Sequence, residues 1–173
     1  VRVRKVKEPR PPEVPLPPGG REMAMRVLQA LVDNPLSDEF HRPVTALHPE
    51  LTDRYTSVVR HPIDLETVAR RLRRGTYDRA AGRLHRDVSR IFGNCELFNR
   101  RESHLFVSIA RHLQAFFDSL WAETDLPLPG ESPSDAAKRR LTLRWRRYRL
   151  CWKRPLKGPA AEGAAAALAA ALS

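Results

Sequence analysis

The sequence predicts an all-α protein whose central part is a left-handed four-helix bundle. Four segments between residues 22 and 121 repeat apolar side chains at intervals of three and four, the period of helices that pack through one face. Prolines lie between the first two segments, and prolines with glycines lie on both sides of the set. The length of 173 residues fits one domain with flanks. We therefore expect a long loop between the first two helices, and basic flanks that are disordered or helical.

The first helix is expected to begin near Glu22 and to end near Asn34-Pro35. Its apolar stripe consists of Ala24, Val27, Leu28 and Leu31. Residues 35–62 then contain four prolines, so they cannot form one regular element, yet they also carry many apolar side chains. A long loop of this composition is expected to be packed and functional.

The second helix is expected from Asp64, which is placed to cap it, to about Arg74, with Gly75 as its stop. The third should occupy about residues 79–98, and the fourth about residues 103–121. Their apolar stripes are Leu65, Val68 and Leu72 in the second helix, Leu84, Val88, Ile91, Cys95 and Phe98 in the third, and Phe106, Ile109, Leu113, Phe116 and Leu120 in the fourth.

The positive charge is concentrated outside the bundle. The formal net charge is +11. Residues 1–20 carry five basic and two acidic side chains, and residues 138–157 carry ten basic and no acidic side chains. Residues 21–137 carry 16 basic and 17 acidic side chains, which nearly cancel. Basic flanks of this kind favour polyanions such as nucleic acid. The sequence therefore divides into a basic, proline-rich linker (1–20), a bundle (21–125), a second linker (126–137), a basic aromatic segment (138–157) and an alanine-rich tail (158–173).

The basic aromatic segment is the candidate nucleic-acid contact. Ser132-Pro133 is typical of a helix start, and a helix would align Leu141, Trp145, Tyr148 and Trp152, although Leu141, Leu143 and Trp145 also alternate as in a strand. Its cations could contact phosphate while its aromatic rings stack on bases. A localisation signal, or a helix whose aromatic face docks on the bundle, is the alternative. The candidate phosphate contacts are Arg139, Arg140, Arg144, Arg146, Arg147, Arg149, Lys153 and Arg154.

Two stretches of the central part form a specific joint pattern. The first, residues 53–65, contains Tyr55 in an expected irregular loop and ends in Pro62-Ile63-Asp64-Leu65. The second, residues 91–99, is the end of an expected amphipathic helix and finishes on Phe98-Asn99. Together with Phe40 and Val44, these motifs occur in the same order as in the bromodomain family, which the chain resembles over residues 22–122.

The resemblance implies a four-helix module that binds acetylated lysine. It implies that Tyr55 and Asn99 face one pocket, where the Asn99 amide donates to the acetyl oxygen and Tyr55 holds a water that reaches the same oxygen. Acetylation removes the charge of lysine and leaves a short amide, so such a pocket should be apolar and narrow. The resemblance places Phe40, Val44, Leu47, Leu51, Val58 and Phe98 in the walls and Leu105 at the mouth.

Two departures from the family pattern affect the expected ligand. Asp38 stands where many members have tryptophan, so the shelf beside the pocket is more polar or absent. Arg100-Arg101 follows the asparagine where members often have proline, and this positive charge on the rim could disfavour very basic histone tails.

The sequence contains no motif of an enzyme or cofactor site. It has no glycine-rich phosphate loop, no Gly-x-Ser-x-Gly and no His-Glu-x-x-His, and His41, His48 and His61 lack the spacing of metal ligands. We therefore expect a monomeric, nuclear, non-catalytic module that needs no cofactor or metal and binds acetylated histones or other chromatin proteins, with DNA or nucleosome affinity from its flanks and no membrane contact. The alternatives are a basic helical nucleic-acid-binding protein with the bundle as scaffold, or a targeting fragment of a larger chromatin enzyme.

Overall fold

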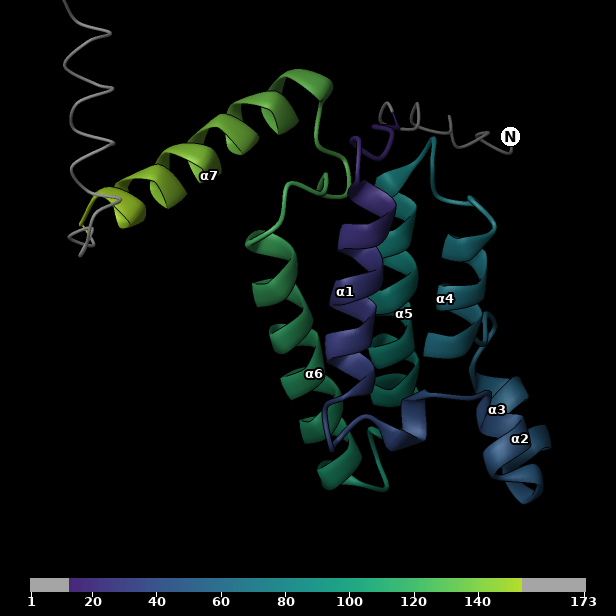
Figure 1. Cartoon of the computed structure of the whole chain (residues 1–173). Helices are drawn as coiled ribbons and strands as arrows, with labels where there is room; N and C mark the ends of the chain where they lie inside the picture. The colour runs from purple at the N-terminus through teal and green to yellow at the C-terminus, as the bar shows by residue number, and fades with distance from the viewer. Residues whose placement is uncertain (1–12, 154–173) are drawn as a thin grey trace, which may run out of the picture. The chain divides into compact units, whose positions relative to one another are not determined.

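The protein is all-helical in the part of the chain that the structure describes. This computed structural model describes the backbone of residues 13–153 and the side chains of residues 13–144. Within those residues it contains helices and no strand, which confirms the predicted all-α class (Figure 1). The chain divides into two compact units, residues 1–139 and residues 140–173. None of the described helices is long and apolar enough to cross a membrane.

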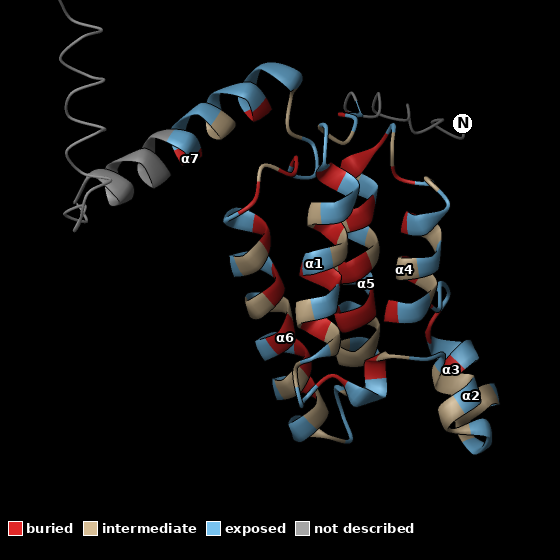
Figure 2. Ribbon diagram, viewed as in Figure 1, coloured by how far each residue is buried: buried red, intermediate tan, exposed pale blue. Residues whose placement is uncertain are grey.

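Four helices form the bundle predicted from the apolar periodicity. They are α1 (Gly20–Val32), α4 (Leu65–Arg73), α5 (Ala81–Asn99) and α6 (His104–Ala122). Helix α5 packs on α4 and α6, and α1 packs on the same two helices. Figure 2 shows buried positions along the facing sides of α1, α5 and α6. The largest buried side chains of this core include Trp121, Phe92, Phe117, Leu31, Leu72, Leu84 and Leu113.

Local side-chain chemistry determines where two of these helices begin. Asp64 caps α4 as predicted: its Oδ1 accepts a hydrogen bond from the Thr67 N–H (2.7 Å) and its Oδ2 accepts one from the Thr67 hydroxyl (2.8 Å). Ser103 caps α6, because its hydroxyl accepts a hydrogen bond from the Phe106 N–H (3.4 Å). At the end of α4, Gly75 has a φ of +75°, a conformation that favours glycine.

The long segment between α1 and α4 contains more helix than the sequence suggests. It forms two short 3-10 helices, η1 (Asp38–Phe40) and η2 (Pro49–Leu51), and two α-helices, α2 (Val44–Leu47) and α3 (Thr52–Val58). The prediction of an irregular loop was therefore wrong for residues 53–58, which lie in α3. The interval between the prolines at positions 49 and 62 leaves room for two helical turns. Phe40, Tyr55 and Val59 are buried, so the segment is packed as expected.

Residues 13–19, expected to belong to a linker, are part of the bundle unit. The Ala81 N–H donates to the Val14 carbonyl (2.9 Å), and the Leu16 N–H donates to the Asp78 carbonyl (2.9 Å). The side chain of Val14 is buried, and Glu13 pairs with Arg83 (2.6 Å). The prolines of this stretch keep it extended, and its backbone amides and carbonyls bond to the turn before α5. Residues 1–12 of the predicted linker lie outside the described residues.

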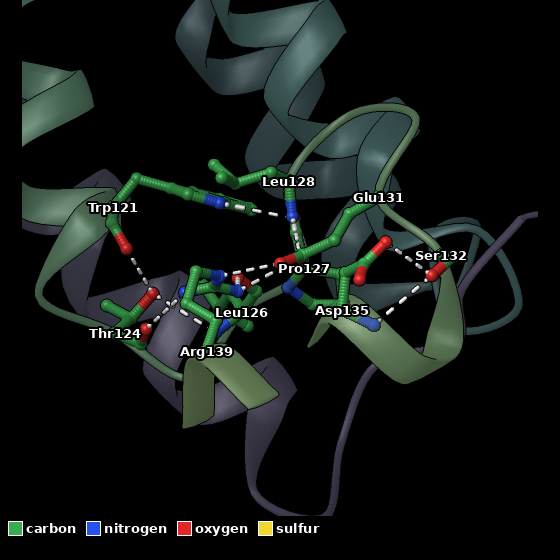
Figure 3. A network of polar contacts seen from close by, with 9 residues as sticks. All are labelled: Trp121, Thr124, Leu126, Pro127, Leu128, Glu131, Ser132, Asp135 and Arg139. Atoms are coloured by element: carbon green, nitrogen blue, oxygen red, sulfur yellow. Dashed lines mark hydrogen bonds and ion pairs between the residues drawn. The ribbon is translucent and has the colours of Figure 1, made fainter. Parts of the chain in front are cut away.

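The second predicted linker is also packed. Leu126 is buried, and the Trp121 indole N–H donates to the Pro127 carbonyl (3.2 Å), as Figure 3 shows. The Thr124 hydroxyl donates to the Trp121 carbonyl (2.6 Å) and accepts from the Leu126 N–H (3.2 Å). A buried turn must satisfy its backbone groups, and these contacts do so here. Residues 124–128 therefore continue the bundle beyond α6.

Arg139 ties the start of α7 (Pro133–Lys153) to this turn. Its guanidinium pairs with both carboxylate oxygens of Glu131 (2.9 and 3.2 Å) and donates to the carbonyls of Thr124 (3.1 Å) and Leu126 (Figure 3). The Arg139 and Glu131 side chains are only 20% and 9% exposed. Arg139, expected to contact phosphate, is thus occupied by intramolecular bonds. Helix α7 confirms the helical alternative for this segment over the strand.

Other predicted features of the C-terminal part are described only in part. Arg140 and Arg144 lie in the described portion of α7. The side chains of Arg146, Arg147, Arg149 and Lys153, together with Arg154 and the alanine-rich tail at 158–173, lie outside the described residues.

We predict that Arg139→Ala destabilises the bundle by about 1–3 kcal/mol, because two carbonyls and a largely buried carboxylate lose their donor. Urea unfolding followed by circular dichroism measures this change. Arg144→Ala is the matched control, since Arg144 is exposed, and its free energy of unfolding should stay near that of the native protein. Equal unfolding midpoints for the Arg139 variant and the native protein would contradict the role of this contact.

Candidate functional site

A cavity of about 150 Å³ lies between the α1–α4 segment and the ends of α5 and α6. Its walls come from η1, α2, η2 and α3 on one side and from α5 and α6 on the other. The lining is mainly apolar and aromatic, with one asparagine, one tyrosine and one cysteine among it. The lining residues are Glu39, Phe40, Arg42, Val44, His48, Leu51, Tyr55, Ile63, Asp64, Ile91, Cys95, Phe98, Asn99 and Phe106.

Asn99, the last residue of α5, has a defined orientation at the cavity. Its Nδ2 donates to the Cys95 carbonyl one turn earlier (3.0 Å) and also lies 3.5 Å from the Cys95 sulfur. A carbonyl oxygen only accepts hydrogen bonds, so the atom facing it must be the amide nitrogen. An amide nitrogen carries two hydrogens. One N–H is bonded to the carbonyl, and the other has only the Cys95 sulfur, a weak acceptor, as its partner, so it can turn to a stronger acceptor in the cavity.

Tyr55 is the second polar group of the cavity and is almost fully buried. Its ring meets the Phe98 ring edge to face, with centroids 5.2 Å apart and an interplanar angle of 70°. Burial raises the pKa of the Tyr55 phenol to about 12, with smaller contributions from Cys95 and Asp64. No hydrogen bond to its hydroxyl is found among the described residues. The phenol is therefore neutral at physiological pH and has a donor to offer.

Cys95 connects the two helices that form the far wall. Its thiol donates to the Phe106 carbonyl in α6 (3.6 Å), while its own carbonyl holds Asn99. Burial raises the pKa of the Cys95 thiol to about 11, although the Asn99 amide acts in the opposite direction. The thiol is thus protonated and uncharged near neutral pH, which suits an apolar wall.

The two acidic side chains at the cavity, Asp64 and Glu39, are already bonded. Both oxygens of Asp64 are taken by Thr67, and His48 Nε2 lies 2.7 Å from a Glu39 oxygen. The hydrogen bond with Glu39 is the main cause that raises the pKa of His48; Glu50, 3.6 Å from its other ring nitrogen, adds to the effect, and partial burial opposes it. Such pairs leave little free negative charge inside the cavity.

An ion pair on the outer surface holds α3 against α5. The Arg54 guanidinium lies over the Phe98 ring, 5.0 Å from its centroid, and pairs with Glu102 in the turn after α5. Arg54 precedes Tyr55 in α3, so this contact and the Tyr55–Phe98 contact join the same two elements. Cation–π and ion-pair contacts at such sites are modest individually, but together they restrict the position of α3.

The family model of the bromodomain matches residues 24–111, which is more than half of the chain. The chain belongs to the bromodomain family. Bromodomains are acetyl-lysine reader modules, and the four-helix bundle and its cavity match that assignment. The resemblance seen in the sequence is thereby confirmed.

Several curated proteins resemble this bromodomain over part of their length. Bromodomain-containing factor 1 of Candida albicans is 33% identical over 85 residues, covering 49% of this chain and 11% of that protein. Bromodomain adjacent to zinc finger domain protein 2A is 32% identical over 128 residues in Mus musculus, covering 66% of this chain and 6% of that protein. The Xenopus laevis protein of the same name is 32% identical over 77 residues, or 44% of this chain and 4% of its own. The chain thus spans a small fraction of each.

Two solved structures share the fold. BDF5 of Trypanosoma brucei, solved with PF-CBP1, has 30% sequence identity and a TM-score of 0.53, covering 61% of this chain and 91% of that one. The second bromodomain of cdg4_1340 from Cryptosporidium parvum, complexed with bromosporine, has 27% identity and a TM-score of 0.54, covering 61% of this chain and 89% of that one.

The bromodomain cavity contains six of the nine residues that the sequence placed there: Phe40, Val44, Leu51, Tyr55, Phe98 and Asn99. The other three do not line it. Leu47 lines a neighbouring hollow with His48, Val58 is 39% exposed on α3, and Leu105 is 68% exposed. Phe106, one residue further along α6, lines the cavity instead. Successive residues differ by about 100° around a helix, so Phe106 faces the cavity while Leu105 points away from it.

Sequence reasoning also missed Ile63, Ile91 and Cys95 as lining residues. Ile91, Cys95 and Phe106 belong to the helical stripes that the sequence assigned to the core, and a cavity at the end of the core is an extension of those stripes. Asn94, the other asparagine near the end of α5, donates to the His61 carbonyl (2.9 Å) and does not line the cavity. Asn94 thus serves the local structure.

The raised pKa of Tyr55 predicts a specific pH dependence of stability. An unfolded phenol has a pKa of about 10. Because the folded pKa is higher, the stabilisation is complete below about pH 10 and is lost as the pH rises toward 12. Over this window the native free energy of unfolding should fall by about 1–3 kcal/mol more than that of Tyr55→Phe. Urea unfolding at a series of pH values measures both curves, and parallel curves would contradict the burial of this phenol.

Proposed function

We propose that the cavity binds the side chain of an acetylated lysine, with Asn99 as the hydrogen-bond donor. The observation that carries this proposal is the Asn99 amide: one N–H is bonded to the Cys95 carbonyl, and the other meets only the weakly accepting Cys95 sulfur in a cavity that Asn99 lines. An acetamide oxygen is a neutral acceptor of the right kind. Membership of the bromodomain family supports the same assignment.

The cavity favours the acetylated over the unmodified lysine. An ammonium group would lose its hydration on entering an apolar cavity, which is costly without a counter-ion. The Asp64 carboxylate is already bonded through both oxygens to Thr67, and Glu39 is engaged by His48. The neutral acetamide avoids this cost and places its methyl group among apolar side chains such as Phe40, Ile63 and Phe106.

Tyr55 supplies the second polar contact through a water molecule. Its neutral phenol can donate to a water that also donates to the acetyl oxygen. The edge-to-face packing on Phe98 fixes the ring, so the hydroxyl has little freedom to leave this position. Leu51 and Val44 complete the channel for the lysine stem.

The partners are acetylated chromatin proteins, histones among them, and the module acts as a monomer in the nucleus. The basic flanks support this setting, because they suit an environment rich in nucleic acid. The curated relatives are many times longer than this chain, so a role as the targeting part of a larger chromatin protein or enzyme fits the same observations.

We predict that Asn99→Ala weakens binding of an acetyl-lysine peptide by about 5- to 150-fold, because the buried acetyl oxygen loses its donor. Tyr55→Phe should weaken it less, since a water-mediated bond is lost while the ring remains. Isothermal titration calorimetry of the full chain with acetylated and unmodified peptides measures both effects.

Asn94→Ala is the matched control for this experiment. It removes the same side chain from the same helix, where the amide bonds to the His61 carbonyl outside the cavity. Its affinity for the acetylated peptide should remain within about twofold of the native value. If Asn99→Ala binds as tightly as Asn94→Ala while both proteins keep their melting temperature, the cavity is not the binding site.

A second activity, nucleic-acid binding, is favoured by the charge of the C-terminal segment. Residues 138–157 contain ten basic and no acidic side chains, and nine basic remain when Arg139 is set aside because of its bonds to Glu131. Arg144 is exposed in α7. Clustered cations on a helix contact phosphates and release counter-ions. The alternative in which the whole protein is a nucleic-acid binder with the bundle as scaffold depends on this same segment.

We predict that deleting residues 140–173 abolishes duplex DNA binding and leaves acetyl-peptide binding unchanged. The deletion keeps Arg139, so the contacts of the bundle with residues 124–139 are preserved. For the full chain, the affinity for DNA should fall with salt at a log-log slope of about −0.9 for each phosphate contacted. Fluorescence anisotropy with labelled duplex DNA measures both. Undiminished DNA binding by the truncated protein would place the contact on the bundle.

A further inference from the structure

The mouth of the cavity carries opposite charges on two sides. The acidic rim, residues 38–53, contains four acidic side chains (Asp38, Glu39, Glu50 and Asp53) and one arginine (Arg42), which gives −3 with neutral histidines. The basic rim, residues 100–102 with Arg54, contains three arginines and Glu102, which gives +2. The acidic rim contributes Glu39 and Arg42 to the lining of the cavity, and residues 100–102 of the basic rim directly follow Asn99, which also lines it.

The acidic rim extends from the cavity wall to the surface. Glu39, Arg42 and His48 line the cavity, and the same three residues line a neighbouring hollow of about 410 Å³ that also contains Asp38. Asp38 and Glu39 are exposed. With His48 protonated, the segment still carries −2, because Glu39 and Glu50 share this one histidine. A ligand leaving the cavity on this side therefore meets a net negative surface.

The basic rim lies at the other wall. Asn99 and Phe106 both line the cavity, so the turn that joins α5 to α6 runs along its edge. Within this turn Glu102 is paired with Arg54, whereas Arg100 and Arg101 are exposed and form no ion pair within the described part of the chain. Two exposed positive charges thus directly follow Asn99, a residue that lines the cavity.

We propose that this site selects acetyl-lysine in a charge-split sequence, with basic residues on one side of the modified lysine and acidic residues on the other. This inference rests on the proposed function of the cavity. A peptide whose acetyl-lysine enters the cavity extends over the surface in both directions by about 3.3 Å per residue, so residues two or three positions away reach the rims. A uniformly basic segment gains at the acidic rim and is repelled at the basic rim.

The size of the expected preference follows from exposed charge pairs. Such pairs each change binding by a small factor and are screened by salt. A charge-split peptide makes a favourable contact at each rim, whereas an all-lysine peptide makes one favourable and one unfavourable contact. The charge-split peptide should therefore bind about tenfold more tightly at low ionic strength. The rims therefore select among acetylated sequences, while the cavity provides the recognition of the acetyl group.

The test uses the full chain and four acetyl-lysine peptides that differ only in their flanks. Two peptides carry lysines on one side and glutamates on the other, in the two possible orders; a third carries lysines on both sides and a fourth glutamates on both. Calorimetry at low salt should show one charge-split peptide binding about tenfold more tightly than the all-lysine and all-glutamate peptides. The difference should shrink as the salt concentration rises.

Reversing the basic rim should change the preference. In Arg100→Glu/Arg101→Glu the two rims are both acidic, so the all-lysine peptide should bind at least as tightly as either charge-split peptide. Arg26→Glu/Arg74→Glu is the matched control, because it makes the same charge change at exposed positions of the chain that do not line the cavity. This control variant should bind the four peptides with the same order of affinities as the native protein.

The outcomes separate this inference from the proposed function. If all four peptides bind equally, and Asn99→Ala weakens all four, the cavity reads acetyl-lysine and the charge-split preference is overturned. Tightest binding of the all-lysine peptide by the native protein also overturns it. If none of the acetylated peptides binds the folded protein, the proposed function fails and the inference falls with it.

Discussion

The hydrogen bond from the Asn99 amide to the Cys95 carbonyl is the constraint on which the site depends. It joins two residues one turn apart in the same helix, and it shows which end of the amide is the nitrogen. The result is a donor that is oriented before any ligand arrives, which reduces the entropy cost of binding. The Cys95 thiol extends this arrangement to the Phe106 carbonyl, so the amide is tied to both walls that α5 and α6 contribute.

The rest of the bundle supports that donor by keeping other charges away from it and by holding the opposite wall. Asp64 lines the cavity, but its cap on α4 uses both carboxylate oxygens, so one residue ends a loop and leaves the cavity without a free anion. On the other wall, Arg54 packs over Phe98 and pairs with Glu102, while Tyr55 packs against the same ring. These contacts join α3 to α5, and Tyr55 and Asn99 line the same cavity.

The sequence predicted the structure correctly where the interactions that determine it join residues close together in the chain. The four helices follow from apolar periodicity, and the Asp64 cap and the helix-terminal Asn99 follow from residues within a few positions of each other. Predictions from the sequence failed where contacts between residues far apart in the chain determine the structure. Residues 126–137 read as a linker by composition, yet Arg139 bonds to Glu131 and to the Leu126 carbonyl and packs this stretch on the bundle. Leu105 was placed at the mouth and Phe106 in the core stripe, but the start of α6 turns Phe106 to the cavity and leaves Leu105 exposed.

The most direct test of the account is a crystal structure of the full chain with a bound acetyl-lysine peptide. We expect the acetyl oxygen to lie about 2.7–3.2 Å from the Asn99 Nδ2, which keeps its bond to the Cys95 carbonyl, and an ordered water to join the same oxygen to the Tyr55 hydroxyl. An acetyl group bound elsewhere on the protein, or an Asn99 side chain that has rotated away from Cys95 to reach the ligand, would contradict the central claim that this donor is oriented in advance.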